Sequence, residues 1–135
     1  MTDGIQSGMV EVKCGDLTGQ ALDWAVAKSV GWTVKILPVH TPSTTYYTIK
    51  SPSGLTLRPS TDWEQAGPLI VSQQINLEWD GVDGKALWWK AAHQDIVQFK
   101  MGETPLIAAC RAIVAAHLGE VVSVPAELVC DGKPK

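Results

Sequence analysis

The sequence has few of the residues that build a metal centre or a disulfide framework. Its 135 residues include three cysteines and three histidines. The cysteines, Cys14, Cys110 and Cys130, are odd in number and widely spaced, which is typical of reduced thiols in a cytosolic protein. No pair of Cys or His residues has the C-x-x-C or H-x-x-x-H spacing that places two ligands on one ion. We therefore expect neither a metal nor a cofactor.

The chain also lacks an excess of basic residues and a long apolar run. Its 11 Lys and Arg residues stand against 14 Asp and Glu residues, for a formal net charge of -3. Such a chain has no general attraction for phosphate backbones, so we expect no nucleic-acid partner. The apolar stretch Leu106–Leu118 is too short to span a bilayer, and Met1–Gly8 lacks the features of a signal peptide. These absences predict a cytoplasmic protein with no membrane partner.

What the chain does contain is typical of one folded domain. The hydrophobic share of 45% and the charged share of 19% are far from the composition of a disordered chain. At this length we expect a single domain at residues 9–130. The polar ends, residues 1–8 and 131–135, are predicted to be flexible tails.

Capping signals and hydrophobic spacing predict an α+β fold. A helix is expected between Thr18 and Gly31, a second between Thr104-Pro105 and Gly119, and a short one at Ser60–Gly67 that Pro68 ends. Runs of β-branched and aromatic residues predict strands at Met9–Lys13, Thr33–Val39, Tyr46–Lys50, Leu69–Ser72, Ile75–Trp79, Ala86–Ala92 and Ile96–Met101. The expected architecture is an antiparallel sheet packed against two main helices.

Arg111 is the most informative single residue, because it interrupts an otherwise apolar helix. A buried guanidinium has to be paired, since desolvating it unpaired costs several kcal/mol. One hypothesis is a structural ion pair with Asp23 or Asp62. The other is a planar fork offered to the phosphate or carboxylate of a ligand.

The segment around the predicted short helix also supports two interpretations. As structure, Ser60 or Thr61 caps the helix, Asp62 complements its dipole and Trp63 anchors the loop. As a site, the same helix start offers N–H groups and hydroxyls to an anion, with Trp63 as a stacking face. The start of the last helix, at Thr104, has the same capacity. Arg58 is either a second cationic contact or a solvated loop charge.

Tryptophan is abundant, with six of the nine aromatic residues. Trp24 lies opposite the apolar stripe of its helix, and Trp88 and Trp89 point to opposite faces of a strand. An outward tryptophan is explained by a covering helix, by a ligand or by a homo-oligomer interface. We predict that Trp24, Asp62, Trp63 and Arg111 line one cleft between the sheet and the helices.

Three blocks of sequence resemble one family of phage proteins. They are Leu17–Ala27, which contains Leu22-Asp23-Trp24; Pro59–Pro68, which contains Ser60-Thr-Asp-Trp63; and Thr104–Val114, which contains Thr104-Pro-Leu106 and Arg111. In this order the blocks are similar to the small bacteriophage and prophage family that includes NinX. The resemblance implies a phage accessory protein made in the cytoplasm of an infected or lysogenic bacterium. It carries over no catalytic residue.

Three functional hypotheses follow from these residues. The first is a non-enzymatic protein that binds a small nucleotide-like ligand and so sequesters a host anti-phage defence signal. Its predicted ligand-binding residues are Asp23, Trp24, Arg58, Ser60, Thr61, Asp62, Trp63, Thr104 and Arg111. The second is an accessory factor that binds or inhibits a host or phage protein. The third, a small nucleotide hydrolase, has the least support, because no nucleophile and base pair is visible and G-x-S-x-G is absent.

Overall fold

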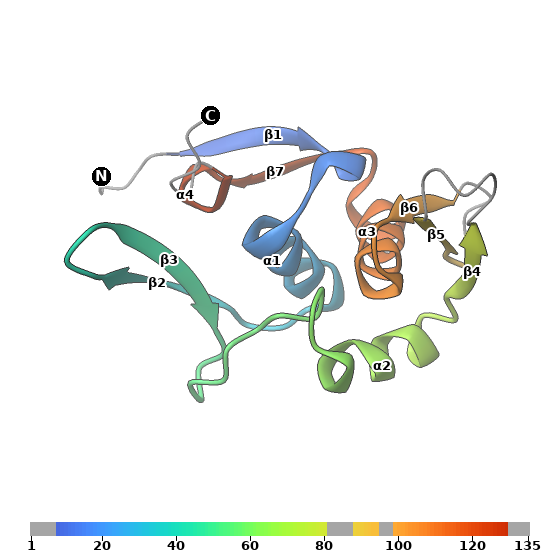
Figure 1. The fold of residues 1–135 in the computed structure, drawn as a ribbon, viewed down its shortest axis with the longest axis horizontal. Helices are drawn as coiled ribbons and strands as arrows, with labels where there is room; N and C mark the ends of the chain where they lie inside the picture. Colours follow the sequence, from blue (N-terminus) through green and yellow to red (C-terminus); the bar gives the residue numbers. More distant parts are fainter. Residues whose placement is uncertain (1–7, 81–87, 95–98, 130–135) are drawn as a thin grey trace.

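The computed structural model describes residues 8–80, 88–94 and 99–129 (Figure 1). The expected tails therefore lie outside the described residues, apart from Gly8. Along the chain the elements are β1 (Met9–Lys13), the 3-10 turn η2 (Cys14–Asp16), α1 (Gly19–Val30), β2 (Lys35–His40), β3 (Thr45–Lys50), α2 (Trp63–Ser72), β4 (Asn76–Asp80), β5 (Trp88–Ala92), β6 (Lys100–Gly102), α3 (Pro105–Leu118), β7 (Val121–Pro125) and α4 (Ala126–Val129). Among the described residues, no helix has the length and apolar character needed to cross a membrane.

The α+β class is confirmed, and the described strands form three small antiparallel sheets. β1 pairs with β7, with Val10 opposite Val124, and β2 pairs with β3. The third sheet has the order β4-β5-β6. The predicted pairing of the β4 and β5 segments is confirmed, while their loop at residues 81–87 lies outside the described residues. Sequence analysis missed β7 and α4.

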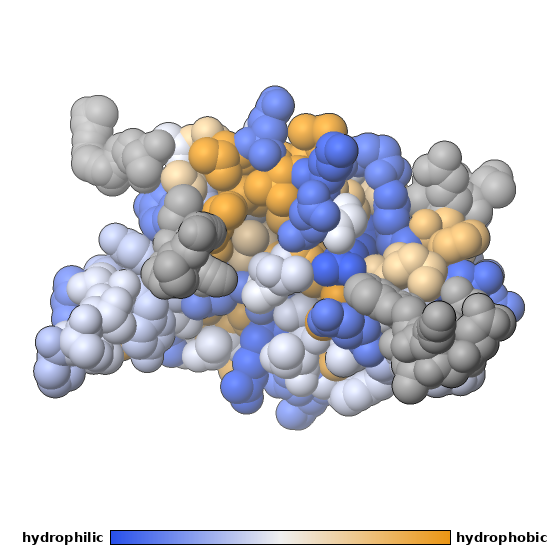
Figure 2. Space-filling view, turned by 45° about the horizontal axis from the view of Figure 1, so that its top comes forward, coloured by the Kyte–Doolittle hydropathy of each residue, from blue (hydrophilic) through white to orange (hydrophobic). Residues whose placement is uncertain are grey.

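The core lies around α3, which packs against α1, β5 and β6 (Figure 1). Its buried run extends from Ala108 to Ala115, which confirms the expectation of a largely buried helix. Leu22 and Val26 of α1 are fully buried in the same cluster. In Figure 2 the hydrophobic residues of one face gather over β1 and β7, where Val122 and Val124 belong to this core.

The predicted caps explain where α1 and α3 begin and end. The Thr104 hydroxyl oxygen accepts a hydrogen bond from the Ile107 N–H at 3.1 Å, and Pro105 occupies the first helical position. Gly31 ends α1 with a φ of 83°, a left-handed conformation that favours glycine. Thr18 precedes α1, as predicted, but its side chain makes no capping bond.

The prediction for residues 60–72 was wrong in two respects. The helix α2 begins at Trp63 rather than Ser60, and it continues through Pro68 to Ser72, where a strand was expected. Proline forfeits one helical hydrogen bond and its ring crowds the carbonyl four residues earlier, but its clash with the Cβ of the preceding residue is absent here, because that residue is Gly67. The helix also buries Ala66 and Leu69 on one face.

The tryptophan predictions have different outcomes. Trp89 is partly buried against the core, and its ring meets Trp79 edge to face with the centroids 5.2 Å apart. The side chain of Trp88 lies outside the described residues. Trp24 is half-buried against the core, with Lys28 Nζ 5.6 Å from its ring centroid.

Candidate functional site

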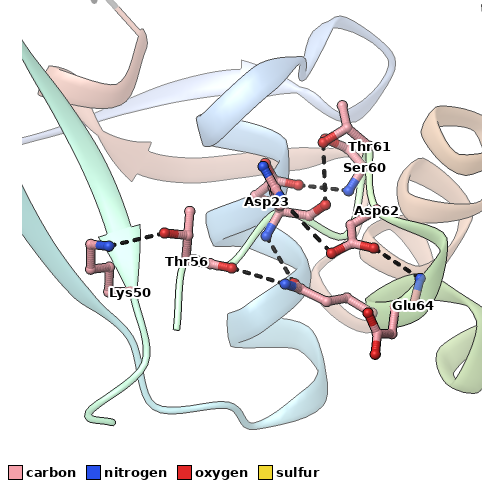
Figure 3. A network of polar contacts seen from close by, with 9 residues as sticks. Asp23, Lys50, Thr56, Ser60, Thr61, Asp62 and Glu64 are labelled. Carbon is pink, nitrogen blue, oxygen red and sulfur yellow. Dashed lines mark hydrogen bonds and ion pairs between the residues drawn. The ribbon is translucent and has the colours of Figure 1, made fainter. Parts of the chain in front are cut away.

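The turn that leads into α2 is built by backbone hydrogen bonds from residues of the predicted site. The N–H groups of Thr61 and Asp62 both donate to the Arg58 carbonyl at 3.0 Å. Asp62 Oδ1 then accepts from the Glu64 N–H at 2.9 Å, so Asp62 caps α2 (Figure 3). This corrects the expectation that Ser60 or Thr61 is the cap. The hydroxyl of Thr61 donates to the Arg58 carbonyl at 3.4 Å instead, so it contributes to the turn and does not cap the helix (Figure 3).

Gln65 fixes this turn from the first turns of α2. Its side-chain oxygen accepts from the Arg58 N–H, and its Nε2 donates to the Thr56 carbonyl, both at 2.9 Å. Lys50 Nζ, on β3, bonds the hydroxyl of Thr56 at 3.0 Å (Figure 3). The segment between β3 and α2 is thus held at several points, which keeps the side chains of the turn in a fixed arrangement.

Asp23 holds the turn before α2 from its buried side. It lies on α1, is 4% exposed, and its Oδ1 accepts from the Ser60 N–H at 2.8 Å. Burial raises the pKa of Asp23 to about 6, against an ordinary value of 3.8. The hydrogen bonds from Ser60 and the charge of Arg58 oppose this rise. Asp23 is therefore a buried acid that anchors the turn.

We expect the variant Asp23→Asn to be more stable than the native chain at about pH 8. In the native fold Asp23 keeps its proton up to about pH 6, whereas the unfolded chain loses it near 3.8. Its contribution to stability is thus fully present below pH 3.8 and is lost as the pH rises through about 6. Asparagine keeps an oxygen for the Ser60 N–H without the cost of burying a charge. The expected gain in the free energy of unfolding is about 1–3 kcal/mol at pH 8.

Urea unfolding of both proteins near pH 4 and pH 8 measures this difference. The variant should also lose the part of the pH dependence that falls between pH 4 and 6. A variant that loses more stability at pH 8 than at pH 4 would show that the charged carboxylate is favourable where it lies.

Four of the predicted site residues line one pocket of about 300 Å³: Ser60, Thr61, Trp63 and Thr104. Pro105, Leu106 and Ile107 complete the described lining. The pocket therefore lies where the N-terminal ends of α2 and α3 come together. The Trp63 side chain is 56% exposed beside it, and the Thr61 and Thr104 residues are also exposed.

The expected ion pair of Arg111 does not form. Arg111 is 6% exposed, and its guanidinium donates to two backbone carbonyls, from Nε to Leu17 at 3.0 Å and from Nη1 to Met101 at 2.7 Å. The predicted partners are engaged elsewhere, Asp23 with Ser60 and Asp62 with Glu64. Burial lowers the pKa of Arg111, and the nearby Cys14, Glu103 and Asp16 oppose this. The prediction was wrong because it considered only charged side chains as partners, whereas the actual partners are backbone carbonyl oxygens.

The predicted cleft is thus only partly assembled. Asp62 and Arg58 lie at the turn that borders the pocket, with Arg58 Nε 3.8 Å from Asp62 Oδ2. Asp23 is buried behind Ser60. Neither Arg111 nor Trp24 is among the described residues that line the pocket.

A larger cavity of about 750 Å³ was not predicted. It lies between α2 and the turn after β3, and its apolar walls include Trp32, Leu55, Leu57, Pro68 and Leu69. Most of its polar groups are already used: Ser51 accepts from the Leu55 N–H, and Gln65 braces the turn. Glu64, on α2, also lines the cavity and adds an acidic group to it. A sequence pattern cannot predict this cavity, because the walls of the cavity come from three separate segments of the chain.

Comparison with protein families tests the family resemblance that the three sequence blocks indicated. Residues 13–117 match the family model described as bacteriophage P22, NinX. The chain belongs to this NinX family. The matched span contains all three motif blocks, and with them Asp23, the capped turn and every described residue that lines the smaller pocket. No curated protein matches the chain. The pocket between α2 and α3 is therefore made by the part of the chain that the NinX family model covers.

Proposed function

We propose that this NinX-family protein binds a small nucleotide-like ligand, without catalysis, at the pocket between the starts of α2 and α3. The observation that carries the proposal is the meeting of two helix N-terminal ends and the exposed Trp63 at one pocket. The phosphate of the ligand lies over the helix starts and its base lies against Trp63. Ligand pockets usually lie between structural elements, and 300 Å³ is at the lower end of their range of volumes.

The helix starts supply the groups that a phosphate needs. The first N–H groups of a helix have no partner inside it, and the helix dipole adds positive potential at the same end. Trp63 is the first residue of α2 and Leu106 is the second of α3, so their N–H groups belong to this set. The Thr104 hydroxyl accepts from Ile107 and still has its own hydrogen to donate.

Arg58 supplies the positive charge in this proposal. Its side chain is 61% exposed, and its 3.8 Å contact with Asp62 is a loose, solvent-exposed ion pair. Such a pair contributes little to stability, so a phosphate can replace Asp62 as its partner at small cost. The guanidinium then forms a bidentate contact with the ligand.

The biological role that fits this activity is removal of a host defence signal during infection. The NinX family is a phage family, and this supports a role in an infected bacterium. We place the activity in the cytoplasm of the infected or lysogenic host. A binding protein serves this role without turnover, because it only has to hold the ligand.

We expect Trp63→Ala to weaken binding of the responsive nucleotide by about 5- to 150-fold while the fold is retained. This range corresponds to the 1–3 kcal/mol that stacking a base on an aromatic ring contributes. The purified protein is titrated calorimetrically with a panel of cyclic and linear nucleotides. Trp79→Ala is the matched control, because Trp79 is 53% exposed on β4 and does not line the pocket.

The same samples distinguish the competing functions. A nucleotide released unchanged after heat denaturation supports binding, and a nucleotide converted to product replaces the proposal with hydrolysis. Absence of uptake across the whole panel, or equal loss in both tryptophan variants, overturns it.

A protein-binding role is the second candidate, and the 750 Å³ cavity favours it. Leu55 in its wall is 56% exposed, and Val71, elsewhere on α2, is 76% exposed. Exposed apolar surface of this kind is common at protein interfaces. The homo-oligomer expected from the tryptophan content is one form of this role, and the oligomeric state in solution tests it.

A further inference from the structure

Two of the three histidines meet at a point that neither proposed pocket includes. His93 follows β5, His117 is in the last turn of α3, and Gln73 follows α2. Both imidazole Nε2 atoms contact the same Gln73 Oε1, His93 at 2.9 Å and His117 at 2.8 Å. The two rings are nearly perpendicular, at 85°, with their centroids 5.7 Å apart. Two imidazole nitrogens from segments separated in sequence thus converge on one amide oxygen.

The spacing of these atoms is close to that of ligands on one metal ion. Nitrogen and oxygen ligands of a tetrahedral zinc ion, at about 2.0–2.1 Å from the metal, lie about 3.3–3.4 Å apart. The two N···O separations, 2.9 and 2.8 Å, are hydrogen-bond distances, so each pair of atoms has to move apart by about 0.5 Å to admit the ion. A metal ion can therefore replace the two hydrogen bonds with small movements of the three side chains.

The donor set indicates which ions would bind. Two imidazole nitrogens favour borderline first-row ions such as Zn²⁺, Ni²⁺ and Cu²⁺ over Mg²⁺ or Ca²⁺, which prefer oxygen. Burial of His93, which is 5% exposed, fixes one ligand, while the exposed His117 leaves a path for the ion and for water ligands. Within the described residues no three His, Cys, Asp or Glu side chains are grouped to hold a metal, so the third protein donor is an amide oxygen.

We propose that Gln73, His93 and His117 form a binding site for a divalent first-row transition-metal ion. In the hydrogen-bonded state each ring presents its Nε2–H to the amide oxygen, which only accepts. When the ion binds, each neutral ring carries its proton on Nδ1, and the Nε2 lone pair faces the metal. The ion joins the ends of α2, β5 and α3, and the site is independent of nucleotide binding.

Zinc binding to chelator-treated protein tests the site. Calorimetric titration with Zn²⁺ should give one site per chain, and Zn²⁺ should raise the melting temperature. Loss of a second-shell partner weakens metal affinity by roughly 10- to 100-fold, and loss of a direct ligand costs at least as much. We therefore expect His117→Ala to weaken binding at least about tenfold. His117 is exposed, so this variant should keep its fold.

Two further variants complete the design. His40→Ala is the matched control, because His40 is an exposed histidine on β2 that contacts Thr45. A Cys130→Ser background removes a competing thiol, while burial raises the pKa of Cys14 to about 11 and leaves little thiolate there. Saturable binding that depends on His117 and not on His40 supports the site. Absence of binding, or equal affinity in the His117→Ala and His40→Ala variants, overturns it.

Discussion

Replacing Gly102 with alanine is expected to reduce the free energy of unfolding by about 3–5 kcal/mol, among the largest effects of a single methyl group. Gly102 is the last residue of β6, and there the strand lies close to the backbone of α3. A Cβ at this position would lie 2.4 Å from the Ala108 nitrogen and 2.8 Å from its Cα. Because these are backbone atoms of a buried helix, no side-chain rotation relieves the overlap. Strand and helix would have to separate.

Gly15→Ala is the matched control for this substitution. A Cβ added at Gly15 would meet no atom within 4 Å, and its backbone does not have a positive φ. We expect a change within about 0.5 kcal/mol there, as for other surface positions. Chemical denaturation of the two variants and the native chain gives the comparison. Similar stabilities for Gly102→Ala and Gly15→Ala would show that β6 and α3 are not in this close contact.

The parts of the fold that could be predicted are those with a local cause. Thr104, Pro105 and Gly119 determine where α3 begins and ends, and each acts on its own backbone. α2 could not be predicted in the same way, because Pro68 is normally a stop signal; the absence of a Cβ on Gly67 removes one of its clashes, and burial of Ala66 and Leu69 favours the helix. β7 depends on pairing with β1, more than a hundred residues earlier in the chain, which no local pattern reports.

The candidate site also has a part that could be predicted from local sequence and a part that depends on tertiary packing. Residue chemistry indicated that Ser60, Thr61, Trp63 and Thr104 have ligand-binding capacity, and the fold brings these four to one pocket. Their convergence depends on the packing of α2 beside α3, so it could be proposed from sequence but not located. The contact between His93 and His117 was invisible for the same reason, because the two residues are on different elements.

Arg111 is where sequence reasoning identified the right residue and the wrong partner. A guanidinium has five N–H donors, and backbone carbonyl oxygens accept from them as carboxylates do, one bond to each oxygen here. The bonds to Leu17 and Met101 tie α3 to the segment before α1 and to β6. Arg111 is therefore a structural link between elements that the hydrophobic contacts alone would leave less precisely aligned.

Arg111→Met is accordingly expected to destabilise the domain by about 2–4 kcal/mol. Methionine retains part of the side-chain volume but donates no hydrogen bond, so two carbonyl oxygens lose their partner, at about 1–3 kcal/mol for each buried group. Relief from burying a charge offsets part of this loss.

A double-mutant cycle of Arg111→Met with Asp62→Asn then separates the two explanations. With carbonyl partners, the coupling energy should be close to zero, because Asp62 acts on Glu64 and Arg58 instead. A coupling energy of more than about 1 kcal/mol would show that Asp62 is the ion-pair partner of Arg111. Urea unfolding of the four proteins supplies the measurement, and the ligand-free protein suffices, since both explanations concern the folded chain itself.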